Sequence, residues 1–142
     1  MNVYLLFWRN KVEAEDGIAL REGIENIDNF IKKVSSENEI YGYVARFNGI
    51  EDSKLNNLQD FLTKKGITSE ITANREFDEG GIFNINSIKW NNIKLEVIRS
   101  SFYNEKTRQE SGEIYIDIRG TKKEDLAHFK KFVLLLTEFL EA

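Results

Sequence analysis

The sequence contains no cysteine and no proline, and it has a single histidine. Without cysteine the chain cannot form a disulfide framework, a thiolate metal site or a cysteine nucleophile. Average usage would give a chain of this length about seven prolines, so their absence excludes proline-rich linkers and cis-proline turns. The lone His128 lies in a predicted helix and has no second imidazole to complete a zinc site, so we expect a surface or partly covered side chain. The sequence therefore has almost none of the cysteine and histidine side chains that commonly act as nucleophiles, general bases or zinc ligands.

Long apolar runs are also missing. The longest runs, Val3 to Trp8 and Phe132 to Leu136, have six and five residues, whereas a membrane-spanning helix needs about 20. No basic residue precedes the first run and Arg9 follows it directly, which is not the order of a secretion signal. We therefore expect no membrane segment and a cytoplasmic protein.

The composition that remains is typical of a folded domain. The 142 residues are 41% hydrophobic, 12% aromatic and 31% charged, which does not fit a disordered or membrane-embedded chain. A chain of this length buries roughly two thirds of the surface that its unfolded form exposes. No internal repeat or low-complexity segment interrupts it. We expect residues 1–142 to form one α+β domain.

Apolar periodicity predicts six strands and three helices. The first strand, at residues 3–8, is apolar at every position, as in a strand buried on both faces. Asn91 and Asn92 separate two strand patterns and favour a tight hairpin. A capping box of Thr121 and Glu124 predicts where a long, strongly apolar C-terminal helix begins. The other strands are expected at residues 40–47, 67–77, 82–90, 93–103 and 114–119, and the other helices at residues 20–34 and 53–65.

This order, β-α-β-α-β-β-β-β-α, predicts two crossover units followed by an antiparallel run. The expected fold is therefore a mixed sheet of about five to six strands with about three helices. The C-terminal helix is expected to pack on the sheet, because its wide apolar stripe must be buried.

The acidic residues are concentrated in one stretch of the chain. Residues 13–28 hold six carboxylates against one base, Arg21, which gives a local charge of −5 in a protein of net charge −4. A dense negative surface can steer a basic partner towards it, although many such stretches only form a solvated surface. The candidate partner-binding residues are Glu13, Glu15, Asp16, Glu22, Glu25 and Asp28.

We interpret the acidic stretch as the binding site of a protein-binding module. The most specific form of this prediction is a small cytoplasmic inhibitor, like bacterial immunity proteins or antitoxins, which neutralises a basic toxin such as a nuclease by direct stoichiometric binding. We expect no catalytic residue, metal or cofactor. No nucleic-acid partner is expected, because the chain is net acidic and a phosphate backbone requires a basic stripe.

Two alternatives remain. A metal-dependent hydrolase or nuclease would hold a divalent cation with Glu96 and Asp117 on neighbouring strands, with Arg119 as the nearby cation. The same three residues are explained more simply as cross-strand charge pairs on a solvated sheet face. The other alternative is a self-associating structural protein, in which an exposed sheet edge joins copies into a homo-oligomer.

Overall fold

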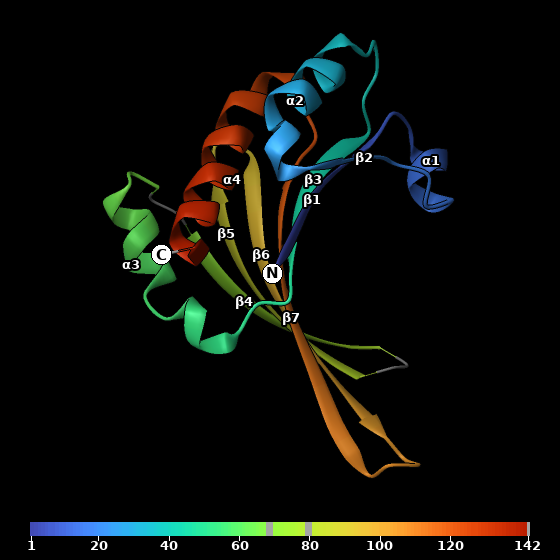
Figure 1. Cartoon of the computed structure of the whole chain (residues 1–142), viewed down its shortest axis with the longest axis vertical. Coiled ribbons are helices and arrows are strands. Elements are labelled where there is room, and N and C mark those ends of the chain that lie inside the picture. The colour runs from blue at the N-terminus through green and yellow to red at the C-terminus, as the bar shows by residue number, and fades with distance from the viewer. Residues whose placement is uncertain (68–69, 79–80, 142) are drawn as a thin grey trace.

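A computed structural model of the chain describes the backbone of residues 1–67, 70–78 and 81–141, and the side chains of residues 1–67, 87–99, 105–108 and 112–141. Seven strands form one sheet in the order β2-β1-β3-β7-β6-β5-β4 (Figure 1). Every neighbouring pair in this sheet is antiparallel. The strands are β1 (Asn2–Trp8), β2 (Leu20–Gly23), β3 (Gly42–Asn48), β4 (Glu70–Asp78), β5 (Gly81–Trp90), β6 (Ile93–Asn104) and β7 (Gln109–Gly120).

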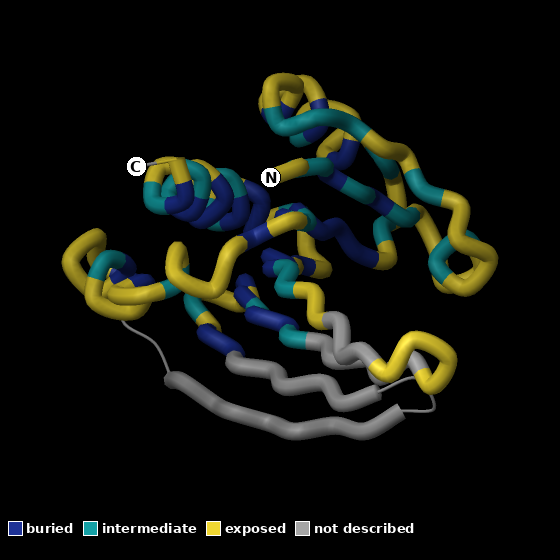
Figure 2. The backbone as a smooth tube through the Cα atoms, turned by 60° about the horizontal axis from the view of Figure 1, so that its bottom comes forward, coloured by how far each residue is buried: buried dark blue, intermediate teal, exposed yellow. Residues whose placement is uncertain are grey.

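Four α-helices accompany the sheet in the described part of the chain: α1 (Lys11–Glu15), α2 (Ile27–Ser36), α3 (Leu58–Lys64) and α4 (Leu126–Glu141). Short 3-10 turns precede the last three of them, at η1 (Ile24–Asn26), η2 (Asp52–Leu55) and η3 (Lys123–Asp125). Helices α2 and α4 lie side by side on one face of the sheet (Figures 1 and 2). None of the helices in the described ranges has the length and apolarity that a membrane crossing requires.

The core lies between the sheet and these helices. One register row across five strands is entirely apolar and buried, and it consists of Ile88, Leu95, Ile118, Ala45 and Leu5. Helix α4 places its buried stripe on this face, and Figure 2 shows the dark blue of that stripe turned towards the sheet. Since strand side chains alternate between faces, the next register row points to the face opposite the core.

Local sequence signals account for several element ends. Asn91 and Asn92 have φ values of 47° and 62° and form the predicted β5-β6 hairpin, because asparagine tolerates the left-handed region that a tight hairpin requires. The predicted capping box is wrong, since Lys122 is the residue before the first turn, no side chain caps it, and α4 follows only after η3. The α3 region ends near Gly66, whose φ is +87°.

The α+β class and the packing of the C-terminal helix on the sheet are confirmed, but the sheet is antiparallel and not mixed. Residues 20–23 were expected to begin a helix, and they instead form the extra strand β2, which reverses the chain between β1 and α2. Helix α3 does join two strands of the same direction, β3 and β4. Because β7, β6 and β5 lie between these two strands, no parallel pair forms.

Candidate functional site

The six acidic candidates lie along one edge of the molecule, on α1, β2, η1 and the start of α2 (Figure 1). Asn10 caps α1 by accepting a hydrogen bond from the Glu13 N–H, at 2.9 Å. Glu22 lies on β2, and Glu25 and Asp28 follow at the entry to α2. The structure therefore places all six in one region, although they do not form a single continuous face.

Most of these carboxylates are already paired within the chain. Four of the six lie within ion-pair distance of a cation: Glu13 with Arg9 at 2.8 Å, Glu15 with Lys11 at 3.7 Å, Glu22 with Lys33 at 2.6 Å, and Asp28 with Lys130 at 2.5 Å. Hydrogen bonds from Arg9 lower the pKa of Glu13, and a hydrogen bond from Lys33 lowers the pKa of Glu22. The remaining two of the six candidates, Asp16 and Glu25, are exposed, and neither has an ion-pair partner among the described residues. The charge available to a partner is smaller than the sequence count.

Exposed apolar side chains gather at the same edge. Val12 is 63% exposed, Ile18 58% and Leu20 36%, and these are three of the six large hydrophobic residues that are exposed in the described part of the chain. Tyr41, another of the six, is 48% exposed, and its N–H donates to the Trp8 carbonyl at 2.9 Å, beside the end of β1.

We call this set, Val12, Asp16, Ile18, Leu20, Glu25 and Tyr41, the α1-β2 corner. The sequence analysis did not identify the apolar residues of this corner. In particular, the spacing of Leu20 from Ile24 led to the prediction that Leu20 lies on the buried stripe of a helix.

Strand β2 contributes a free backbone edge to the α1-β2 corner. It is one of the two terminal strands of the sheet order, and within the described backbone it pairs only with β1, over the register from Tyr4 opposite Gly23 to Phe7 opposite Leu20. The outer side of a terminal strand presents N–H and C=O groups that can pair with an extended segment of another chain. Exposed apolar side chains and a backbone template thus lie along α1 and β2, with Asp16 at the α1 end of β2 and Glu25 beyond its other end.

The acidic residues of the hydrolase alternative meet in the middle of the sheet. Glu96 and Asp117 are register partners on β6 and β7, and Arg46 lies opposite Asp117 on β3. Asp117 is completely buried. Its two oxygens accept hydrogen bonds from Arg46 Nε and Nη2, both at 2.9 Å, and Arg119 Nη2 donates at 2.7 Å. This carboxylate raises the pKa of Arg46, and burial raises the pKa of the neighbouring Tyr115.

These carboxylates are arranged as charge pairs, and a divalent cation does not fit them. Magnesium requires oxygen ligands with free lone pairs in near-octahedral geometry, but both oxygens of Asp117 already face guanidinium groups. Glu96 pairs with Lys94 at 3.3 Å. Within the described ranges, no group of three or more histidine or acidic side chains is placed to hold a metal ion. The geometry favours the cross-strand charge pairs over the hydrolase site.

His128 is half-buried in α4 and packs its ring against the edge of Trp90, with ring centroids 5.1 Å apart. Its Nδ1 is buried and has no hydrogen-bond partner in the described structure. A general base needs a donor or acceptor within hydrogen-bond reach. The packing against Trp90 therefore indicates a structural role for this side chain.

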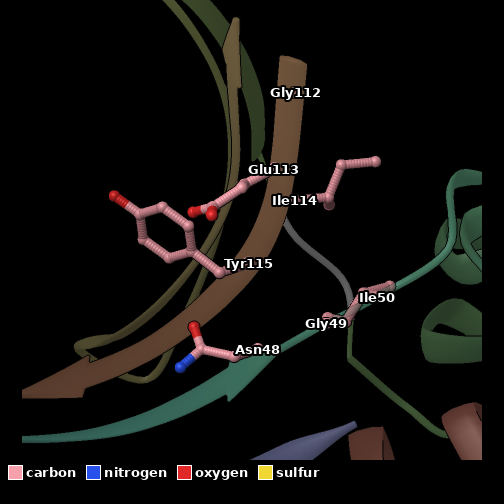
Figure 3. A pocket seen from close by; sticks show the side chains of 7 residues that line it. All are labelled: Asn48, Gly49, Ile50, Gly112, Glu113, Ile114 and Tyr115. Carbon is pink, nitrogen blue, oxygen red and sulfur yellow. The ribbon is translucent and has the colours of Figure 1, made fainter. Parts of the chain in front are cut away.

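A pocket of about 390 Å³ opens where β3 and β7 separate (Figure 3). Their pairing ends at Phe47 opposite Ile116, and the Ile50 N–H then reaches the Ile114 carbonyl at 3.4 Å. Figure 3 shows Asn48, Glu113 and Tyr115 projecting to one side of the backbone and the two isoleucines to the other. The Asn48 amide also donates to the Tyr4 hydroxyl. The lining has no nucleophile paired with a base, and the pocket is not an evident catalytic centre.

Comparisons with protein-family models, with curated proteins and with solved structures give no match for this chain. The candidate functional surfaces are therefore defined by the residues of this chain alone. The two that stand out are the α1-β2 corner and the charged face of the sheet opposite the helices.

Proposed function

We propose that this chain is a protein-binding module that docks a basic protein partner on the α1-β2 corner. The observation that supports the proposal is that exposed apolar side chains and the terminal strand β2 adjoin each other, with an unpaired carboxylate at either end of the strand. Each supplies a different part of recognition, namely affinity, register and attraction of the correct charge.

The apolar side chains supply most of the binding free energy in this proposal. Val12 and Ile18 are 63% and 58% exposed, and covering each of them with a partner contributes about 1–2 kcal/mol at the usual value per unit of apolar area. An extended segment of the partner added beside β2 would hydrogen-bond to its backbone and fix the register. Asp16 and Glu25 would accelerate encounter with a basic surface, as the net charge of −4 also does.

In its most specific form, the partner is a basic toxin such as a nuclease, and the chain is a stoichiometric inhibitor of the immunity-protein or antitoxin kind. The unpaired carboxylates would then occupy positions that substrate phosphates take on the toxin.

Self-association through β2 is a second use of the same edge. A two-fold pair of β2 strands would place two acidic corners against each other, since an isologous interface repeats the same surface on both copies. Like charges at such short range are unfavourable. A basic heterologous partner fits the α1-β2 corner better than a second copy does.

The test is a capture of partners from the source cells, followed by binding measurements with the purified partner and two matched pairs of variants. Ile18→Ser should raise the Kd about tenfold, because it removes roughly 1–2 kcal/mol of apolar burial. Leu134→Ser removes an apolar side chain that is 44% exposed on α4 and should leave the Kd unchanged. Asp16→Lys should slow association and flatten its salt dependence, whereas Glu141→Lys, at the end of α4, should do neither. Equal effects within either pair would refute the proposed surface.

A further inference from the structure

Three cations lie next to one another across the sheet. Lys89 on β5 is the register partner of Lys94 on β6, and Lys94 is in turn the register partner of Arg119 on β7. This row is adjacent to the buried row of Ile88, Leu95 and Ile118, so it points to the face opposite the helices. Like charges directly opposite each other on neighbouring strands destabilise a sheet. The cationic row therefore lowers the stability of the sheet, and its presence points to a role other than folding.

The neighbouring carboxylates neutralise only part of this cationic row. Glu96 pairs with Lys94 at 3.3 Å, and Asp117 binds Arg119 at 2.7 Å. Asp117 is also shared with Arg46, at 2.9 Å. Lys89 is exposed and has no ion-pair partner among the described side chains. On β4, Glu70 is the register partner of Lys89, so across strands β3 to β7 these two register rows hold four cations against three carboxylates.

A pocket of about 470 Å³ lies directly on the cationic row. Lys89, Lys94 and Arg119 line it, together with the polar residues Ser87, Asn92 and Thr121. Asn92 belongs to the β5-β6 hairpin turn, and Thr121 follows the end of β7. A pocket of this volume is in the range that accommodates a small molecule.

We propose that this pocket binds the phosphate group of a small phosphorylated molecule. Three cations and no carboxylate are among the described residues that line the pocket, so a phosphate group would sit between like-charged side chains that otherwise repel one another. The buried Asp117 fixes the Arg119 guanidinium through Nη2, so its other N–H donors are preorganised for an oxyanion. Lys89 supplies a mobile point charge on the opposite side.

The ligand is a small molecule and not a nucleic-acid backbone. A polymer of phosphates requires a basic stripe that continues along the surface, whereas the next row on the same face of the sheet contains Glu96 and Asp117. The pocket lies on β5, β6 and β7, away from the α1-β2 corner, and the inference does not depend on the protein-binding proposal.

The experiment compares thermal melts and NMR titrations in sodium phosphate, ribose 5-phosphate and sodium chloride at equal ionic strength. Both phosphates should raise the Tm above the chloride value, because a ligand that binds only the folded state stabilises it. Lys89→Glu places a carboxylate between Lys94 on β6 and Glu70 on β4, so the Tm of this variant in chloride is the reference for its own phosphate response. The same variant should weaken phosphate binding by at least about tenfold, the loss expected for one charge-assisted contact. Lys64→Glu makes the same change of charge on exposed α3 and should keep the phosphate response.

Tighter binding of ribose 5-phosphate than of inorganic phosphate would assign the pocket to a phosphate monoester, and equal binding would assign it to the phosphate group alone. A Tm in phosphate no higher than in chloride would overturn the proposal, as would equal phosphate responses of Lys89→Glu and Lys64→Glu. A single-stranded oligonucleotide that bound more tightly than ribose 5-phosphate through Lys89 would overturn the small-molecule assignment.

Discussion

The buried carboxylate of Asp117 allows the sharpest prediction about stability. It lies at the centre of the sheet, is completely buried, and accepts three hydrogen bonds from Arg46 and Arg119. Asp117→Asn keeps the size of the side chain but removes its charge and replaces one acceptor oxygen with an NH2 group that faces a guanidinium. The variant should therefore leave both arginines poorly compensated.

The magnitude follows from burial. Breaking a fully buried ion pair costs about 3–5 kcal/mol. Here the side chains of Arg46 and Arg119 are 33% and 46% exposed, so water recovers part of the loss, and the asparagine retains one acceptor. We expect a loss of about 2–3 kcal/mol in the free energy of unfolding, or roughly 6–10 °C in Tm for a chain of this size.

Urea unfolding at pH 7 measures this loss, and Asp52→Asn is the matched control. Asp52 forms an ion pair with Arg99 at 3.3 Å, but its side chain is 73% exposed, and surface pairs of this kind contribute about 0–1 kcal/mol. If Asp117→Asn lost less than about 1 kcal/mol, or no more than Asp52→Asn at the same m-value, burial would not be what gives the Asp117 cluster its strength.

Three further predictions concern Tyr43, Gly120 and Glu13. Tyr43→Phe removes the hydrogen bond from the hydroxyl to the Lys122 carbonyl at 2.7 Å and should cost about 1 kcal/mol at pH 7. Burial raises the pKa of Tyr43, so the advantage of the wild type should shrink as the pH rises above the unfolded value of about 10, as urea unfolding at pH 8 and pH 11 would show. Gly120→Ala places a methyl group into the ring of Tyr43 and should cost about 1–3 kcal/mol in the same assay, whereas Gly42→Ala, whose new methyl lies 3.4 Å from the nearest atom, should cost less. Hydrogen bonds from Arg9 lower the pKa of Glu13, so Glu13→Gln should destabilise the fold at pH 7, and its difference from the wild type should disappear as the pH falls below about 4; a constant difference between pH 7 and pH 2.5 would contradict this.

The sequence predicted the elements that depend on local signals. The C-terminal helix follows from a long apolar stripe, and the β5-β6 hairpin from two asparagines that tolerate positive φ. Strand β2 was not predicted, because residues 20–23 are extended only through their pairing with β1. The direction of neighbouring strands also depends on which strands are inserted between them. The order of strands along the chain does not reveal that β7, β6 and β5 lie between β3 and β4 in the sheet. For this reason a parallel pair, and with it a mixed sheet, was expected.

The candidate site shows the same division between local and distant information. The acidic stretch was visible in the sequence, and the pairs of Glu13 and Glu15 with cations four residues away follow a common helical spacing. The pairing of Asp28 with Lys130 depends on how α2 packs beside α4. The cationic row of Lys89, Lys94 and Arg119 appears only when the register of three strands is known.

The pairing of β3 with β7 has a consequence for the order of folding. Arg46 and Asp117 are 71 residues apart in sequence, and β7 is the strand that joins β1, β2 and β3 to the β4-β5-β6 meander. During synthesis, the β3 edge remains unpaired until the last strand has emerged from the ribosome, and contacts of such long range close slowly. A ribosome that stalls before β7 would leave a nascent chain with an open strand edge and an uncovered apolar face, the two features that make an unfinished chain prone to aggregation.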